Sequence, residues 1–225
     1  MLFSWIKKRE NKFNFLYFYK YCLSIYIKEE NQMFLEVETK VRINDVNELR
    51  KKIKKIANFE KKESRGDDYF ALNEKFRKHG YPKKAFRIRD NKKEFVVNFK
   101  KWRKNFWTKE IVVKEEFEFI INETKNFLAL IKDLGFVEWM KKIKTTESYL
   151  HKKDKKIVIE INKIKHLGYF MEIEYLAKPR EIKKAKKKIY GVLRELKINK
   201  NQVDNTGYTK MLWDKGIKDE KHFIK

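Results

Sequence analysis

Residues 35–43 read LEVETKVRI, and this stretch carries the clearest structural signal in the chain. Apolar or β-branched residues occupy every odd position, and charged residues occupy every even position. A period of two with many β-branched side chains is typical of a β-strand that has one apolar and one polar face. We therefore predict a strand whose charged face carries Glu36, Glu38, Lys40 and Arg42.

Short alternating or apolar segments recur along the rest of the chain and predict further strands. These strands are expected at residues 67–72, 84–90, 94–102, 110–121, 137–150, 156–163 and 169–176, the last two separated by a turn at Gly168. No stretch is rich enough in Gly or Pro to mark a second domain. We therefore expect one domain over residues 33–225, preceded by an N-terminal extension at 1–32.

Three segments with apolar residues at helical spacing predict helices. The first, residues 46–57, follows Asp45, with Glu48 three positions later as a capping box. The second, residues 123–134, precedes Gly135, which suits a left-handed residue after a helix. The third follows Pro179, has a lysine-rich outer face, and carries one apolar stripe, formed by Ile182, Ala185, Ile189, Val192, Leu193 and Leu196.

The charged faces of the expected strands allow two interpretations. An antiparallel strand can turn a polar face to water while its apolar face packs on a core. With about eight strands and helices to cover the apolar faces, the sheet can instead close into a barrel with a charged interior. Buried ions need partners, water or a ligand, because isolated ones cost several kcal/mol each. We predict an α+β fold, an eight-stranded antiparallel β-barrel with helices packed outside.

The two signs of charge are sorted by strand. The first and last strands carry carboxylate pairs, at Glu36 and Glu38 and at 172 and 174, whereas the middle strands carry pairs such as Arg87 and Arg89. Carboxylates on one face suit a hard cation such as Mg²⁺ or Mn²⁺. Guanidinium groups match phosphate oxygens. The pattern suggests a cavity for a metal-bound triphosphate.

Several motifs resemble the CYTH domain, a family also called triphosphate tunnel metalloenzymes. Residues 36–40 (EVETK) resemble the ExExK signature, 68–70 (DYF) a D-Y-F strand, and 87–89 (RIR) an R-x-R strand. Residues 166–174 (HLGYFMEIE) are similar to the ending of the family's last strands, and 207–212 (GYTKML) resemble the class IV adenylyl cyclase branch. The resemblance implies a tunnel of eight antiparallel strands that binds a nucleotide or inorganic triphosphate with Mg²⁺ or Mn²⁺.

The resemblance also implies roles for individual residues. The implied metal ligands are Glu36, Glu38, Glu172, Glu174 and Asn162. The implied phosphate-binding residues are Lys40, Arg87, Arg89, Lys100 and Lys144, of which Lys40 and Lys144 are also the expected catalytic residues. Further candidates for the site are Glu116, Glu118, Glu160 and Lys142.

Two positions depart from the family pattern. Asn162 stands where the family usually has an Asp, and Thr146 stands where a basic residue is common. An amide oxygen brings no charge to a cation, which weakens a divalent site. We expect a metal-dependent enzyme that either cyclises ATP to cyclic AMP and pyrophosphate or hydrolyses a triphosphate. The alternatives are a catalytically weakened triphosphate sensor and a non-enzymatic RNA- or polyphosphate-binding protein.

The overall composition restricts the possible binding partners less than the placement of charge on the strand faces does. The 57 Lys and Arg against 32 Asp and Glu give a net charge of +25, which favours anions but also fits the bias of AT-rich coding. A nucleic-acid partner, which the basic aromatic loop at 101–107 suits, is not favoured, because the carboxylate pairs would repel it. A homodimer stays open. The lone Cys22 excludes an intrachain disulfide and fits a cytoplasmic protein.

The extension at 1–32 is read in two ways. Residues 13–27 are aromatic and aliphatic but shorter than the roughly 20 residues that a spanning helix needs. They can form an interfacial anchor, or the natural start can be Met33 with the preceding residues misread. The second interpretation is preferred because a complete strand motif follows Met33, and no firm membrane partner is predicted.

Overall fold

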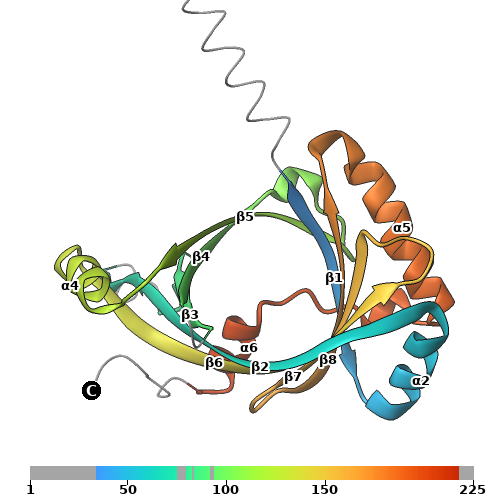
Figure 1. Ribbon diagram of the computed structural model, residues 1–225, viewed down its shortest axis with the longest axis horizontal. Helices are drawn as coiled ribbons and strands as arrows, with labels where there is room; N and C mark the ends of the chain where they lie inside the picture. Colours follow the sequence, from blue (N-terminus) through green and yellow to red (C-terminus); the bar gives the residue numbers. More distant parts are fainter. Residues whose placement is uncertain (1–33, 75–79, 83, 92–93, 218–225) are drawn as a thin grey trace, which may run out of the picture. The chain divides into compact units, whose positions relative to one another are not determined.

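The computed structural model describes residues 34–74, 80–82, 84–91 and 94–217. The chain divides into two units at Phe34, and the second unit, Leu35–Lys225, contains eight antiparallel strands in a closed barrel (Figure 1). This confirms the predicted fold class. The predicted extension at 1–32 lies outside the described residues. The strands are β1 (Leu35–Ile43), β2 (Ala57–Leu72), β3 (Phe86–Asp90), β4 (Phe95–Trp102), β5 (Val112–Ile121), β6 (Phe136–His151), β7 (Ile157–Ile164) and β8 (Gly168–Ala177).

Strand β1 closes the ring, whose order is β1-β5-β4-β3-β2-β6-β7-β8. It pairs with β5 on one side, at Glu36 opposite Lys114, and with β8 on the other, at Lys40 opposite Glu172. Its alternation turns Glu36, Glu38 and Lys40 into the barrel, while Leu35 on the other face is fully buried. The charged faces therefore look inward, as the barrel interpretation requires.

Helices α2 (Val46–Ile56), α4 (Lys125–Asp133) and α5 (Ile182–Glu195) lie outside the barrel (Figure 1). Pro179 starts a 3₁₀ turn that leads into α5, and the predicted apolar stripe of α5 is buried. Asp45 caps α2 as predicted, since its carboxylate accepts from the backbone N–H of Asn47 and Glu48 at 3.0 and 2.9 Å. The other half of the predicted capping box is replaced, because the Glu48 carboxylate pairs with Lys52. None of the helices within the described residues is long and apolar enough to cross a membrane.

The predicted strand at 67–72 is too short, because β2 begins at Ala57, directly after α2. Residues 57–66 are mostly charged or polar, a composition that is depleted in strands and gave no strand signal. Strand β6 holds this segment in place by pairing along the whole length of β2, from Ala57 opposite His151 to Leu72 opposite Phe136. Tertiary pairing here overrides local propensity.

One further helix, α6 (Tyr208–Asp214), contributes Tyr208 and Thr209 to the lining of the barrel cavity. Its residues Tyr208, Met211 and Leu212 are buried in a cluster with Trp139 and Phe170. Seven residues are too few to show a helical period, so the sequence analysis identified this segment only through its family resemblance. The helix brings the C-terminal part of the chain to the barrel interior.

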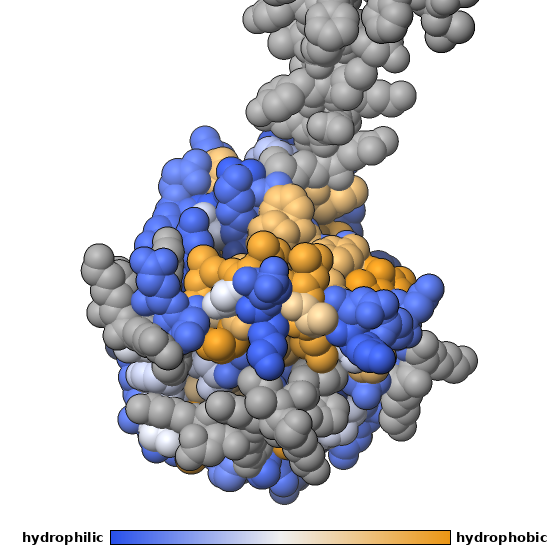
Figure 2. Space-filling view, turned by 90° about the vertical axis from the view of Figure 1, so that its left-hand side faces the viewer, coloured by the Kyte–Doolittle hydropathy of each residue, from blue (hydrophilic) through white to orange (hydrophobic). Residues whose placement is uncertain are grey.

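The side of the barrel that carries α4 has an apolar centre (Figure 2). Strands β4 and β5 contribute Phe99, Phe117 and Phe119 with exposed fractions of 43, 37 and 49%, and the rings of Phe99 and Phe117 stack at 4.5 Å. Exposed aromatic side chains on one sheet face normally find a cover. Within the described part of the chain, these three rings keep more than a third of their surface exposed, so helices cover the outer strand faces only in part.

Substitutions at two glycines test how the backbone conformation at each position affects stability. Gly135 follows α4 with φ +83°, the left-handed conformation predicted for it, whereas Gly191 lies within α5 at an ordinary helical φ. Gly135→Ala should lower the free energy of unfolding by about 1–2 kcal/mol, because a Cβ is strained at positive φ. Gly191→Ala should raise it by about 0.5–1 kcal/mol, because no described atom lies within 4 Å of the added Cβ. Urea unfolding of both variants checks these signs, and equal effects would contradict them.

Candidate functional site

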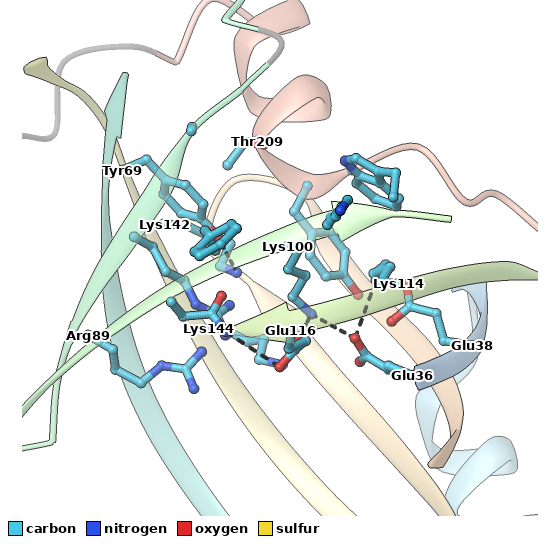
Figure 3. A pocket seen from close by; sticks show the side chains of 18 of the residues that line it. Glu36, Glu38, Tyr69, Arg89, Lys100, Lys114, Glu116, Lys142, Lys144 and Thr209 are labelled. Atoms are coloured by element: carbon cyan, nitrogen blue, oxygen red, sulfur yellow. Dashed lines mark hydrogen bonds and ion pairs between the residues drawn. The ribbon is translucent and has the colours of Figure 1, made fainter. Parts of the chain in front are cut away.

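The barrel surrounds a cavity of about 770 Å³ that is lined mainly by charged side chains (Figure 3). Thirteen of the fourteen candidate residues named from the sequence line it, and Asn162 is the exception. The lining candidates are Glu36, Glu38, Lys40, Arg87, Arg89, Lys100, Glu116, Glu118, Lys142, Lys144, Glu160, Glu172 and Glu174. The structure therefore brings both signs of charge into one cavity.

Strands β1, β7 and β8 are neighbours and together form an acidic wall. Two groups of three carboxylates each have oxygens within 4.8 Å of one another: Glu36, Glu38 and Glu174, and Glu160, Glu172 and Glu174. Glu174 belongs to both groups. Clustered carboxylate oxygens are the ligands that hard divalent cations prefer, so the donor set fits Mg²⁺ or Mn²⁺.

The pKa values of the acidic wall differ according to the neighbours of each carboxyl. Burial raises the pKa of Glu38 to about 7, with Lys114 opposing the shift. Burial, together with the carboxylates of Glu36 and Glu160, raises the pKa of Glu174 well above its usual range. Burial and the neighbouring carboxylates therefore disfavour the ionised forms of these two acids, and a bound cation would favour them.

Two lysines from β4 and β5 face the acidic wall. Lys100 donates to Glu36 at 2.9 Å and also pairs with Glu116, while Lys114 pairs with Glu38. Burial alone would raise the pKa of Glu36, but these two ammonium groups hold it well below its usual range. Lys114 was missed by the sequence analysis, although it shares the alternation of Glu116 on β5, and this parity was the available signal.

Lys40 extends from β1 and is buried against the segment that precedes α6. Its ammonium donates to the carbonyl oxygen of Thr206 and lies 4.2 Å from the centre of the Tyr208 ring. Burial lowers the pKa of Lys40 to about 8. The C-terminal segment therefore helps to position a predicted phosphate-binding residue.

A basic wall is formed by β3 and β6. Arg87 and Arg89 project from β3, and Lys142 and Lys144 from β6, with Lys144 Nζ 3.2 Å from Glu160 Oε2. Beneath the first three of these cations lies Asp67 of β2, which is 1% exposed and which the sequence analysis missed. The motif residue quoted there, Asp68, points to the opposite face of β2 and lies 3.6 Å from Lys141.

The two departures from the family pattern contact each other. The amide nitrogen of Asn162 donates to Glu172 at 2.7 Å and to Glu160 at 3.3 Å, and its carbonyl oxygen accepts from the Thr146 hydroxyl at 2.7 Å. Asn162 is fully buried behind the carboxylates. This geometry makes it a donor that orients two acids, and its role as a metal ligand stays a prediction.

The remaining candidates, Glu116 and Glu118, lie on the β5 side of the cavity. Glu116 pairs with Lys100, and Glu118 accepts from Asn98 at 2.8 Å and lies 4.0 Å from Arg87. Both therefore contact groups of the basic side and do not belong to either carboxylate cluster. In these positions Glu116 can orient Lys100, and Glu118 can orient Arg87.

The cavity as a whole places a carboxylate wall opposite a set of Lys and Arg side chains. Such an arrangement can hold a cation and a polyanion side by side, because each compensates the wall that it faces. It can also stabilise charge that develops on a phosphate chain during transfer, since the donors are already in place. These capacities follow from the geometry alone.

Known proteins match the chain both in sequence and in fold. The CYTH domain family model matches residues 35–208. The protein MJ0240 of Methanocaldococcus jannaschii, named as a candidate adenylate cyclase, is 30% identical over 180 residues, which cover 79% of this chain and 98% of that protein. The PH1819 protein of Pyrococcus horikoshii has a solved structure with a TM-score of 0.64 and 30% identity, covering 80% of this chain and 99% of that one.

A more distant structure shows the same fold. HpAC1 of Hippeastrum, a candidate adenylyl cyclase described as having a dominant triphosphatase activity, matches with a TM-score of 0.51 and 14% identity. The match covers 80% of this chain and 96% of HpAC1. Because the family model spans all eight strands and the MJ0240 protein is 30% identical over nearly its whole length, the chain belongs to the CYTH domain family.

Proposed function

We propose that this protein is a metal-dependent enzyme that acts on a triphosphate, either as an adenylyl cyclase or as a triphosphatase. One observation carries the proposal. Two carboxylate clusters that share Glu174 face Lys100, Lys144 and the β3 arginines across a single cavity. A metal-bound triphosphate is a ligand that satisfies both sides at once.

The carboxylates would hold Mg²⁺ or Mn²⁺. Glu36, Glu38 and Glu174 form one candidate set, and Glu160 and Glu172 complete the other with Glu174. A divalent cation bound there supplies charge neutralisation on the phosphate chain and stabilises the departing oxygen. The raised pKa values of Glu38 and Glu174 are consistent with the fit, because burial and nearby carboxylates disfavour their ionised forms and a cation between them would offset both effects.

The basic residues would bind and orient the phosphates. Arg87, Arg89 and Lys100 offer N–H donors to non-bridging oxygens, and Lys40 and Lys144, the predicted catalytic residues, lie beside the acidic wall, where charge develops. Attack of a ribose 3′-hydroxyl on the α-phosphate breaks its bond to the bridging oxygen and yields cyclic AMP and pyrophosphate. Attack of water on the terminal phosphate yields inorganic phosphate and the shortened chain.

The experiment that tests the proposal is product analysis. The full chain is incubated with ATP, thiamine triphosphate or tripolyphosphate, each with Mg²⁺, Mn²⁺ or chelator, and the products are separated. Metal-dependent formation of cyclic AMP would identify a cyclase, and metal-dependent release of phosphate would identify a triphosphatase. Tight binding of a triphosphate without turnover would instead support a sensor, and metal-independent RNA binding would support the nucleic-acid alternative.

The cytoplasmic location stays a prediction from the single cysteine.

Removing the charge of two ligands should abolish turnover. The double variant Glu36→Gln, Glu38→Gln keeps the side-chain shape but removes two of the three charges in one carboxylate cluster. We expect turnover to fall more than about 100-fold, the scale at which one group of a preorganised site contributes. Steady-state kinetics at saturating Mn²⁺ measures the loss.

The matched control is Glu48→Gln, Glu60→Gln, in which both residues are exposed and lie outside the cavity. It makes the same chemical change and should keep wild-type turnover. A cavity variant that retains turnover would remove Glu36 and Glu38 from the mechanism.

Cation binding should depend on pH with a known sign. Burial raises the pKa of Glu38 to about 7, so this carboxyl is protonated at lower pH and must lose its proton to bind a cation. Affinity for Mn²⁺ should therefore fall as pH drops below 7, by about tenfold per pH unit from the Glu38 proton alone, with proton release on binding. Calorimetric titration in two buffers of different ionisation enthalpy measures both quantities. An affinity that does not change with pH in this range would contradict the prediction.

A further inference from the structure

Asp67 is a buried acid that the proposed chemistry does not use. It lies on β2, is 1% exposed, and does not belong to the described lining of the cavity. Arg87, Arg89 and Lys142, which do line the cavity, all contact it. The carboxylate therefore shares the inward face of β2 with Arg65 and Tyr69, and the three cations that do line the cavity leave it almost no exposed surface.

The contacts of Asp67 are directional. Arg89 donates to it twice, from Nε to Oδ1 at 2.7 Å and from a terminal nitrogen to Oδ2 at 3.3 Å. Two parallel bonds from one edge fix the plane of a guanidinium group. The other terminal nitrogen of Arg89 takes no part in these two bonds, and Arg89 lines the cavity.

The other two cations are held at the same carboxylate. Lys142 Nζ lies 2.9 Å from Oδ2 and donates to the Tyr69 hydroxyl at 3.0 Å, so two of its three N–H groups have partners on β2. Arg87 donates to Oδ2 at 3.4 Å. Each cation is thus restrained from behind, and part of its hydrogen-bonding capacity remains for the cavity.

Stability alone is a poor explanation for this cluster. A buried ion network costs desolvation that its internal attraction barely recovers, and apolar replacements of such networks are often neutral or stabilising. Burial would raise the pKa of Asp67, but Lys142, Arg87 and Arg89 hold it well below its usual range, so the carboxylate stays ionised. An ionised group that contacts three lining cations and no ligand space is suited to holding those cations in place.

We propose that Asp67 is a positioning residue that orients Arg87, Arg89 and Lys142 so that their free N–H groups converge on the phosphate chain. The inference rests on the proposed function, because it assumes that this wall binds a triphosphate. A positioning role and net charge predict opposite changes in anion affinity when Asp67 is replaced. Removing a negative charge from the wall should tighten anion binding by simple attraction, whereas losing the restraint should weaken it.

The test is the affinity of the full chain for tripolyphosphate, measured by calorimetry in Asp67→Asn and Asp67→Glu. Asparagine keeps the shape and removes the charge, and glutamate keeps the charge but moves the carboxylate by one methylene. Both should bind about tenfold or more weakly, the scale of groups that orient ligating residues. Asp68→Asn is the matched control, because Asp68 is equally buried at 1% but faces the outside of the barrel, and it should bind as the wild type does.

Turnover separates positioning from a loss of folded protein. A positioning role raises KM with a much smaller change in kcat, whereas a smaller folded fraction lowers apparent kcat and leaves KM unchanged. If Asp67→Asn does not fold, the Asp67→Glu measurement decides. The wild type can bind tripolyphosphate while the folded Asp67 variants bind it equally or more tightly. That result would overturn this inference and leave the proposed function intact. Absence of tripolyphosphate binding in the wild type would overturn the proposed function itself.

Discussion

Compensation of charge inside a closed sheet is the constraint on which the rest of the structure depends. A barrel whose strands turn their charged faces inward removes those ions from bulk water, which costs several kcal/mol for each unpaired ion. The protein meets this cost by placing opposite signs across the interior, as in the 2.9 Å contact of Lys100 with Glu36 and the contacts of Lys144 with Glu160 and Glu172. The acidic wall keeps two carboxylate clusters that share Glu174, and their oxygens are the ligand type that a hard divalent cation prefers.

Net charge and charge placement carry different information here. The surplus of +25 indicates an anionic partner but does not distinguish a nucleic acid from a small polyphosphate. Inside the barrel both signs are present, and the carboxylate clusters around Glu174 would repel an anion without a cation beside them. The face on which each charge lies is therefore more informative than the sum.

The closed sheet and nearly all of the candidate site could be predicted because alternation fixes the face of each residue, and the motifs fix the order of the strands. What the sequence could not supply was depth and cross-strand proximity. Asp67 and Lys114 have the right parity, but their roles come from neighbours on other strands, such as Arg89 and Glu38. The first half of β2 and the helical conformation of α6 were not predicted because tertiary contacts, and not local propensity or period, form them.

The pairing of β1 with β8 has a consequence for how the molecule is made. The first strand finds its two partners only at residues 112–114 and 169–177, so it has no neighbour in the ring while the intervening chain is being synthesised. Contacts between residues this far apart in sequence form late, because loop closure must precede them. Glu36 and Glu38 thus lie on a strand that has at most one partner, β5, until residues 169–177 are made, and only then can the barrel close around them.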